Sequence, residues 1–385
     1  MSRVKITEVK TFLVHAEWKN LVFIELSTNE GICGIGEATI TGGLEKPVEA
    51  TVHEMRKFML GEDPFNVIQL WQKMYRVIHD ARPPGTIQTS AIGGIEMALW
   101  DIIGKKLNTP IYNLLGGHCR DKIRVYANCH RFFRSARSLT DYARKAVEAV
   151  ERGFTALKWD PFGECSTIIS EANLHKTSEL VKTVRDAVGD DVDLCVEAHG
   201  RFNTYTAIKI AHELEPYNPL WFEEPVPPEN MTALAEVKRK ATIPIASGER
   251  VFTKYGFSNL LEQRAVDIIQ PDVVHVGGIL EMKNVGAMAE AHYLPVAPHN
   301  PNGPIASSAT LQVASFLPNF LIFEYFLEDF PWLDEIAIPP LRIRNGYIDV
   351  PTKPGLGIEV NKETLAKYPY KEVMPSLKLD EEVYM

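Results

Sequence analysis

The stretch DLCVEAH, residues 193–199, is a short apolar run that ends in a carboxylate and an imidazole. The same form returns in NPLWFEEP, residues 218–225, and again in IPIASGER, residues 243–250. The acids that end these runs are Glu197, Glu223 and Glu249. They are spaced at equal intervals of 26 residues, about the length of one strand, one helix and two loops. This period predicts successive β/α units of a parallel barrel, with the acids side by side at its C-terminal mouth.

The chain beyond Arg120 alternates between short apolar runs and amphipathic segments. Eight of the apolar runs are candidate strands: Ile123–Asn128, Ala156–Trp159, Asp193–Val196, Leu220–Phe222, Pro244–Ala246, Asp267–Gln270, Leu294–Ala297 and Phe320–Phe323. This alternation predicts an α/β fold, a (β/α)8 (TIM-like) barrel with its helices outside.

The first part of the chain has a different pattern. Strand-like runs at 4–14, 20–27 and 32–38 precede helix-like segments at 48–59, 67–79 and 89–107, which predicts an α+β capping domain. We expect exposed loops at 15–19 and 82–86, and a C-terminal tail that makes a hairpin at Asn345-Gly346 and completes the capping domain. The expected domains are 1–118, 119–340 and 341–385.

Composition excludes several classes of protein. The chain has 385 residues, 45% of them hydrophobic, and a net charge of −9. The charge argues against nucleic acid as a partner, and no apolar run is long enough to span a membrane. Five scattered cysteines without a C-x-x-C pair indicate reduced thiols. We expect a cytoplasmic protein that forms a homo-oligomer, with an octamer among the candidate assemblies.

The three equally spaced acids form a candidate metal site. Three carboxylates crowded at one barrel mouth repel each other, and a hard divalent cation is their natural counter-charge. Of the neighbours Glu223 and Glu224, only one can face the metal, because adjacent side chains of a strand point to opposite sides. A lone glutamate near a strand end is usually a solvated charge or a salt-bridge partner, and this is how we interpret Glu37 and Glu359.

The next two units also end in ionisable groups, Asp272 and His299, 27 residues apart. A carboxylate beside an imidazole fixes its tautomer and raises its basicity, which is the arrangement of a general base. Alone, each would be interpreted as a loop cap or as a histidine satisfied by backbone. On adjacent strand ends they predict a dyad.

Further polar residues are expected at the same mouth. Lys158 and Asp160 end the second strand; an ordinary ion pair between them is the alternative to contact with a substrate. His199 shares the face of Glu197, and Glu324 could donate a hydrogen bond to an oxyanion if it is protonated. Arg250 is a further candidate for substrate contact.

These residues together resemble the enolase superfamily, and within it the mandelate racemase branch. The resemblance extends to the capping domain through GICGIGE, residues 31–37, and ALWDIIGK, residues 98–105. It implies that Glu197, Glu223 and Glu249 bind Mg²⁺. It also implies that a base removes the proton α to a substrate carboxylate while the metal neutralises the enediolate that forms.

The acid–base groups indicate which enzymes of this branch the chain resembles most. Racemases of this branch carry K-x-K at the second strand, whereas here the second lysine is replaced by Asp160. EAHGRF, residues 197–202, and KWDPFG, residues 158–163, are similar to the acid-sugar dehydratases, gluconate and galactonate dehydratases above all.

This implies loss of water from a sugar acid to give a 2-keto-3-deoxy acid. His299, oriented by Asp272, would be the base and His199 the acid, with Lys158 on the substrate carboxylate and Glu324 donating to its oxygen. The alternatives are an epimerase, racemase or lactone cycloisomerase on the same scaffold, or a sugar-acid binding protein without catalysis.

Overall fold

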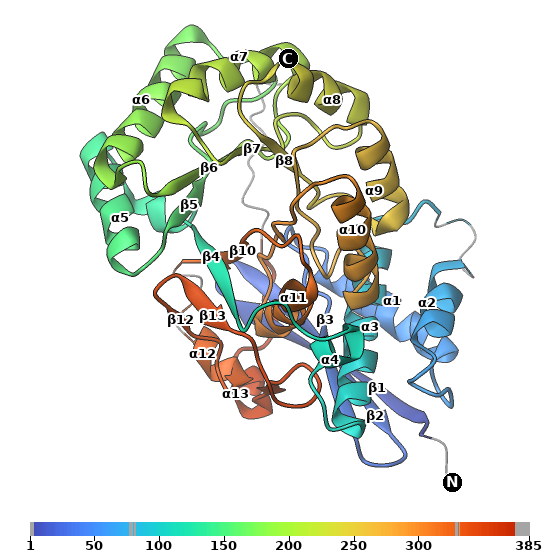
Figure 1. Cartoon of the computed structure of the whole chain (residues 1–385). Coiled ribbons are helices and arrows are strands. Elements are labelled where there is room, and N and C mark those ends of the chain that lie inside the picture. The colour runs from blue at the N-terminus through green and yellow to red at the C-terminus, as the bar shows by residue number, and fades with distance from the viewer. Residues whose placement is uncertain (1–3, 77–79, 81, 328–329, 331, 374–385) are drawn as a thin grey trace.

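The structure is a computed structural model that describes residues 4–76, 80, 82–327, 330 and 332–373. Its N-terminal part is an antiparallel sheet of order β1-β2-β3 packed on helices, at the lower right of Figure 1. The elements are β1 (Ile6–Ala16), β2 (Lys19–Thr28), β3 (Cys33–Glu37), α1 (Glu45–Met55), α2 (Val67–Arg76), α3 (Thr86–Lys106) and α4 (Ile111–Leu115). This part confirms the predicted order of strands followed by helices.

The glycine motif of β3 is explained by its contact with α3. A Cβ atom at Gly36 would lie 1.8 Å from the carbonyl oxygen of Gly94, and one at Gly34 would lie 2.1 Å from that of Ala98. Only glycine allows the strand to approach the helix this closely. The apolar face of α3 is accordingly buried.

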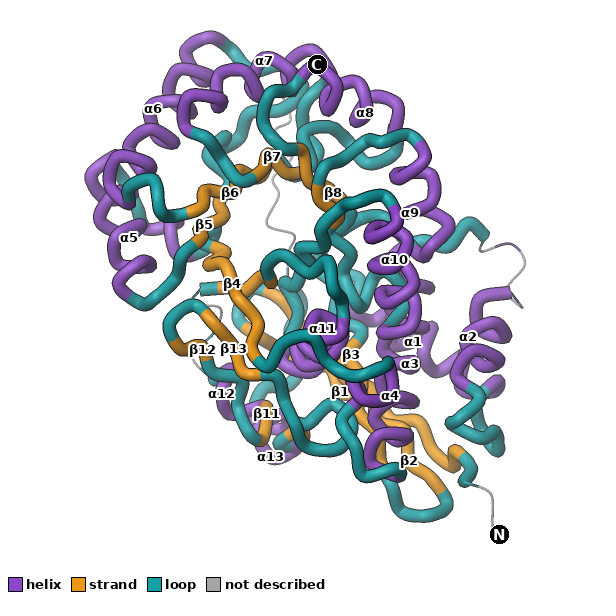
Figure 2. The backbone as a smooth tube through the Cα atoms, in the orientation of Figure 1, coloured by secondary structure: helices purple, strands orange, loops and turns teal. Residues whose placement is uncertain are grey.

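The rest of the chain forms the predicted barrel, a ring of strands with helices outside (Figure 2). The parallel strands are β4 (Lys122–Asn128), β5 (Ala156–Trp159), β6 (Asp193–Glu197), β7 (Trp221–Glu223), β8 (Ile245–Ser247), β9 (Ile268–Ile269) and β10 (Phe323–Phe326). The helices are α5 (Leu139–Glu151), α6 (Glu171–Val188), α7 (Thr204–Leu214), α8 (Met231–Lys240), α9 (Thr253–Glu262), α10 (Ile279–Ala291) and α11 (Pro304–Phe316). Pairing of β10 with β4 closes the ring.

Six of the predicted strands match the structure to within one residue at each end, and two differ more. The seventh is reduced to Val296, which makes single bridges to Ile269 and Phe320. The eighth was expected at 320–323 but begins at Phe323, so Glu324 lies inside the strand and does not end it. At Val296 and Phe320 the chain contributes isolated bridges to the ring, and an apolar run of four residues does not reveal this.

The expected loop at 15–19 is wrong. β1 and β2 run together as a hairpin in which His15 pairs with Asn20 and Ala16 with Lys19. Lys19 is buried, and its Nζ donates to the carbonyl of Pro301 at 2.7 Å. A polar residue of this segment, Lys19, therefore makes a fixed contact between the capping sheet and the barrel, which its polar character does not reveal in the sequence. Of the second expected loop, at 82–86, the structure confirms residues 82–85, and α3 begins at Thr86.

The C-terminal segment contacts both parts of the molecule. Its elements are α12 (Leu333–Ile336), β11 (Ala337–Ile338), β12 (Ile343–Arg344), β13 (Tyr347–Asp349), β14 (Glu359–Val360) and α13 (Lys362–Lys367). The predicted hairpin joins β12 to β13, and β13 pairs antiparallel with barrel strand β4. Farther on, the carbonyl of Tyr368 accepts from His15 N at 2.9 Å, so the tail also reaches the capping sheet. The domain boundaries given above stay a prediction.

Two buried acids of the capping part hold barrel helices. Glu37 accepts from the backbone of Gly303 at 2.5 Å and Ala306 at 3.0 Å, at the start of α11. Glu96 accepts from Ile279 and Leu280 at the start of α10, at 2.7 and 2.9 Å. These N–H groups have no partner within a helix, and a carboxylate satisfies them.

The interpretation of Glu37 as a solvated charge is therefore wrong, because its side chain is completely buried. Glu359, by contrast, is 63% exposed and pairs with Lys105 at 2.8 Å, as expected of a surface charge. In the described part of the chain, no helix is both long and apolar enough to cross a membrane. All five cysteines are free.

Candidate active site

Glu197, Glu223 and Glu249 converge at the barrel mouth, as their spacing predicted. Glu197 ends β6, Glu223 ends β7, and Glu249 follows β8 by two residues. One carboxylate oxygen from each lies within 4.8 Å of the others. Gly248 makes the turn to the third acid at φ 146°, where a Cβ would lie 2.8 Å from the backbone nitrogen of Gln270.

Burial makes this cluster electrostatically costly. Burial raises the pKa of Glu223 well above its ordinary value, and the nearby charge of Glu197 raises it further. Burial likewise raises the pKa of Glu197, against the opposing effect of Lys158. For Glu249 the cost of burial is outweighed by His299 and Arg250, which lower its pKa to about 2.

The neighbours Glu223 and Glu224 separate as predicted. Glu223 joins the acid cluster, and its Oε2 also accepts from the indole of Trp221 at 2.8 Å. Glu224 accepts from two nitrogens of Arg250, at 3.2 and 2.5 Å. Arg250 thus has a fixed carboxylate partner, and its substrate contact stays a prediction.

His299 and Asp272 lie in direct contact. The Nδ1 atom of His299 is 2.9 Å from Oδ2 of Asp272, and its Nε2 is 3.1 Å from Oε2 of Glu249. Burial alone would lower the pKa of His299, but the carboxylates of Glu249, Glu324 and Asp272 outweigh it and raise the pKa to about 10. The side chain of Asp272 is completely buried, so its bond fixes the ring from the side opposite Nε2.

Lys158 lies among the acids rather than beside Asp160. Its Nζ is 2.8 Å from Glu223 Oε1, 2.9 Å from Glu324 Oε1 and 3.4 Å from Glu197 Oε2. These charges outweigh its burial and raise the pKa of Lys158 well above its ordinary value. The alternative of an ordinary ion pair with Asp160 is therefore wrong.

Glu324 is an acceptor in this arrangement. It accepts from Asn128 Nδ2 at 2.8 Å and from the backbone of Asn300 at 2.7 Å, besides its contact with Lys158. Burial would raise the pKa of Glu324, but Lys158 and His299 lower it below its ordinary value. An ionised carboxylate cannot donate, so this arrangement does not support the expected role of a protonated donor.

His199 has a carboxylate partner that the sequence did not suggest. Its Nδ1 lies 2.8 Å from Oδ2 of Asp160, while its backbone N–H donates to Glu197 Oε1 at 2.7 Å. Asp160 in turn binds Arg201, at 2.6 and 2.5 Å. Arg201 was missed because a lone arginine beyond a strand end carries no signal of its own.

Other supporting residues were also missed. Asn302 donates to Asp272 at 3.0 Å, and the ring of His130 packs edge-on against that of His199 with centroids 5.7 Å apart. Burial lowers the pKa of His130 to about 4, so this ring is neutral at pH 7. Both follow strand ends of the barrel, which is the one signal that could have found them.

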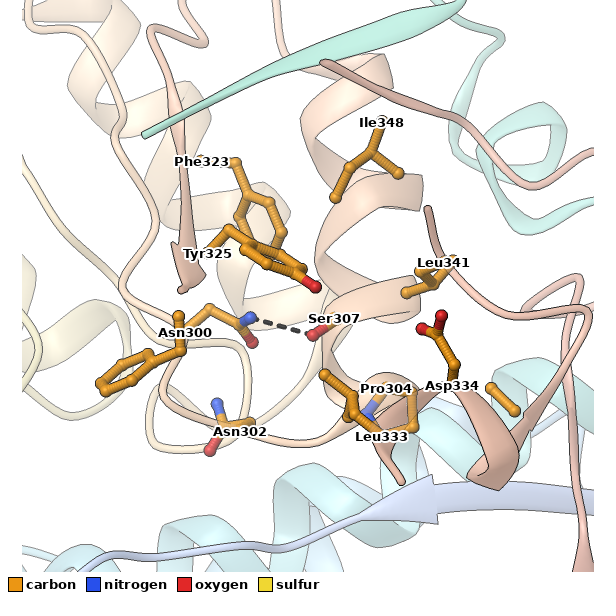
Figure 3. Close-up of a pocket in the computed structure, with 12 residues that line it drawn as sticks. Asn300, Asn302, Pro304, Ser307, Phe323, Tyr325, Leu333, Asp334, Leu341 and Ile348 are labelled. Carbon is orange, nitrogen blue, oxygen red and sulfur yellow. Dashed lines mark hydrogen bonds between the residues drawn. The ribbon is translucent and has the colours of Figure 1, made fainter. Parts of the chain in front are cut away.

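A cavity adjoins the site behind β10, shown in Figure 3. Asn300 and Asn302 line it, and the amide of Asn300 donates to Ser307 of α11 at 2.9 Å. None of the acids or histidines of the cluster lines this cavity. We therefore interpret it as the space behind two supporting residues, distinct from the catalytic centre.

The donor set of the acid cluster fits a hard divalent cation. Carboxylate oxygens are the ligands that Mg²⁺ prefers, and three of them converge here with their ligand atoms close together. The group contacts basic side chains of Lys158, Arg250, His299 and His275, but these are outnumbered by its buried or half-buried carboxylates: Glu197, Glu223, Glu224, Glu249, Glu324 and Asp272. Burial and the nearby charge of Glu197 raise the pKa of Glu223, and an added cation would offset both effects.

Known proteins share both parts of this architecture. Residues 3–116 match the family model "Mandelate racemase / muconate lactonizing enzyme, N-terminal domain", and residues 141–364 match "Enolase C-terminal domain-like". The D-xylonate dehydratase of Haloferax volcanii is 35% identical over 94% of this chain and 88% of its own. The D-gluconate/D-galactonate dehydratase of Picrophilus torridus is 36% identical over 92% of this chain and 90% of its own.

Among solved structures, a mandelate racemase/muconate lactonizing enzyme-like protein from Roseovarius sp. TM1035 superposes with a TM-score of 0.92. It is 34% identical, over 98% of each chain. Superfamily members of this kind depend on a divalent metal, for which the acid cluster here is suited. The motifs, the fold and these relatives agree: the chain belongs to the mandelate racemase/muconate lactonizing enzyme family of the enolase superfamily.

Proposed function

We propose that the chain is a Mg²⁺-dependent dehydratase that removes water from a C5 or C6 sugar acid and gives a 2-keto-3-deoxy acid. Its relatives are named as dehydratases of D-xylonate, D-gluconate and D-galactonate. One observation carries the proposal: two histidines, each bonded to a carboxylate, flank the acid cluster. His199 follows β6 and His299 follows the position of Val296, four places apart in the ring of strands. A base and an acid are therefore available on opposite sides.

Glu197, Glu223 and Glu249 would hold Mg²⁺, which supplies positive charge to the enediolate that forms when a proton leaves C2. His299 removes that proton through Nε2, while Asp272 holds Nδ1. When the charge of Glu249 is balanced by a cation, the pKa of His299 would fall from about 10. The neutral imidazole, which can accept a proton, would then be favoured. Lys158 binds the substrate carboxylate through its ammonium group, which the neighbouring carboxylates keep protonated.

His199 then acts on the departing group. It gives a proton to the C3 hydroxyl, which leaves as water, and the electron pair of the enediolate forms the C2–C3 double bond. The enol product tautomerises to the keto acid. The protein thus separates base and acid between two imidazoles, each with its own carboxylate.

Epimerisation is the rival reaction on this scaffold, because His199 could return a proton to the opposite face of C2. Racemases of this branch use the second lysine of K-x-K and a histidine as two bases. Asp160, which binds His199 and Arg201, stands in place of that lysine, so one of the two bases is lost. A lactone cycloisomerase would likewise need no leaving hydroxyl.

A product assay tests the proposal. Purified protein with Mg²⁺ is incubated with D-gluconate, D-galactonate and D-xylonate, and 2-keto-3-deoxy acid is measured with semicarbazide and by mass spectrometry. We expect keto acid from at least one substrate. Epimerised or lactonised substrate without any keto acid would contradict the proposal.

A further inference from the structure

Asp160 is fully engaged at a place where a substrate contact was expected. Its side chain is 7% exposed, and both oxygens are occupied. Oδ2 meets His199 Nδ1 at 2.8 Å, Arg201 Nη2 meets both oxygens, and the backbone of Phe162 donates to Oδ1 at 3.0 Å. A carboxylate held in this way has no lone pair directed at a substrate polyol without breaking an existing bond.

Arg201 is itself anchored to the backbone. Its Nε donates to the carbonyl of Ala198 at 2.9 Å, and its Nη1 donates to that of Gly163 at 2.6 Å. The guanidinium therefore links the turn after β5 to the turn after β6, with Asp160 between them. A planar fork that binds both carboxylate oxygens fixes their orientation as well as their position.

His199 needs this support more than His299 does. Its side chain is 39% exposed, against 12% for His299, so packing restrains its ring less. Its backbone adopts φ 51° and its N–H is tied to Glu197, which fixes where the side chain starts but not how the ring turns. The bond from Nδ1 to Asp160 supplies the missing restraint and leaves Nε2 as the free nitrogen.

We propose that Asp160, held by Arg201, is the positioning residue of His199, and that it directs Nε2 at the leaving C3 hydroxyl. This rests on the dehydratase function proposed above. Asp160 acts through His199, as Asp272 acts through His299, and it does not touch the substrate. The site then contains two dyads with separate tasks, one for each half of the elimination.

The step that depends on Asp160 is the breaking of the C3–O bond. The form of His199 that acts here carries a proton on each ring nitrogen. The proton on Nε2 passes to the hydroxyl oxygen, which takes the bonding pair and leaves as water, and the Nδ1 proton stays on the bond to Asp160. A 3-deoxy-3-fluoro substrate loses fluoride instead, with the same bonding pair and without need of a proton. Both substrates lose the same C2 proton to His299 and give the same keto acid.

This difference in leaving group provides the test. Wild type, Asp160→Asn, His199→Asn and Asp272→Asn are compared on the aldonate that wild type turns over fastest and on its 3-deoxy-3-fluoro analogue. Asp186→Asn is the matched surface control, since Asp186 pairs with Lys182 on the surface and is 60% exposed.

We expect Asp160→Asn to lower kcat for the natural aldonate by about 10- to 100-fold. It should keep fluoride elimination within about threefold of wild type, because general acid catalysis is not needed there. Asp272→Asn should lose both reactions, and Asp186→Asn neither. Equal loss of both reactions in Asp160→Asn, or loss of neither, would overturn the proposal.

A second measurement needs no substrate and no metal. Long-range ¹H–¹⁵N spectra of the protein report the tautomer of each imidazole, and His199→Asn identifies the signals of His199. We expect a protonated Nδ1 on His199 in wild type and a displaced Nδ1 signal in Asp160→Asn. An unchanged His199 spectrum in Asp160→Asn would overturn the proposal. If wild type gives no keto acid at all, the dehydratase function fails, while these spectra still decide whether Asp160 positions His199.

Discussion

Two sets of buried or half-buried carboxylates, one in the capping part and one at the barrel mouth, behave in opposite ways. Glu37 and Glu96 of the capping part are surrounded by donors, chiefly the first N–H groups of α11 and α10. Glu197, Glu223 and Glu249 face one another at the barrel mouth. The first set is satisfied by the protein itself and holds two domains together. The second is left with excess charge and is suited to a cation.

Burial alone therefore does not identify a functional acid. All five carboxylates are buried or nearly so. Only those that lie close to other carboxylates carry negative charge that the protein leaves unbalanced. Variants of the two sets should accordingly fail in different ways.

The largest effect should come from the barrel set. Chelation of divalent metal, or the change Glu223→Gln, should lower kcat about 1,000-fold or more, because a Lewis acid contributes several kcal/mol to the transition state. Steady-state formation of keto acid measures this loss, and Mg²⁺ should restore the chelated wild type but not the variant. Full turnover by metal-free protein would show that the barrel set does not need a cation and would contradict its difference from the capping set.

Next in size are the histidines that border the barrel set. His299→Asn and His199→Asn should each cost about 100- to 10,000-fold in dehydration. They should differ in exchange of the C2 hydrogen with deuterated water. His299→Asn should lose exchange because no proton is removed, and exchange that continues in His199→Asn would show the base intact.

Mass spectrometry of recovered substrate measures the label in both variants. Exchange that survives in His299→Asn but is lost in His199→Asn would reverse the two assignments.

The capping set should appear in stability and its pH dependence. Burial raises the pKa of Glu96 from 4.5 to about 7, despite the N–H groups that it accepts from. A raised folded pKa means that its contribution to stability is complete below pH 4.5 and is lost as pH rises through 7.

Relative to Glu96→Gln, wild type should therefore lose about 3 kcal/mol of unfolding free energy between pH 4.5 and 8, because each pH unit between the unfolded and folded pKa values costs about 1.4 kcal/mol. Urea unfolding at several pH values measures this loss. A difference between the two proteins that does not change with pH would contradict this assignment.

The smallest effect is expected at Glu37. Glu37→Gln places an amide where two carboxylate oxygens accept from Gly303 and Ala306, and it should cost about 1–3 kcal/mol of stability. The rate per folded molecule should hardly change. Glu359→Gln, on the surface, is the control and should cost less than about 0.5 kcal/mol. A large fall in kcat with normal stability would place Glu37 in the catalytic set.

The sequence predicted the barrel set and not the capping set, for a physical reason. Glu197, Glu223 and Glu249 repeat with the period of the β/α unit, and a period is visible in one sequence. Glu37 and Glu96 bind backbone N–H groups at 303–306 and 279–280, far along the chain. Every residue except proline has a backbone N–H group, so residue types do not show which N–H groups a buried carboxylate will bind.

The same limit applies within the active site. Asp272 and His299 were paired because both end neighbouring strands. Asp160 was placed at the mouth, but its bond to His199 depends on how two turns lie beside each other, with Arg201 between them. Residues 15–19 were assigned to a loop because the buried Lys19 resembles a loop residue until the barrel covers it.

Binding of Mg²⁺ to metal-free protein, followed by isothermal titration calorimetry, tests the central claim most directly. Glu223→Gln and Glu224→Gln form a matched pair, since both acids are buried and adjacent, but only Glu223 belongs to the cluster. We expect one Mg²⁺ site in wild type, its loss in Glu223→Gln and its retention in Glu224→Gln. Binding that survives in Glu223→Gln and vanishes in Glu224→Gln would contradict the account.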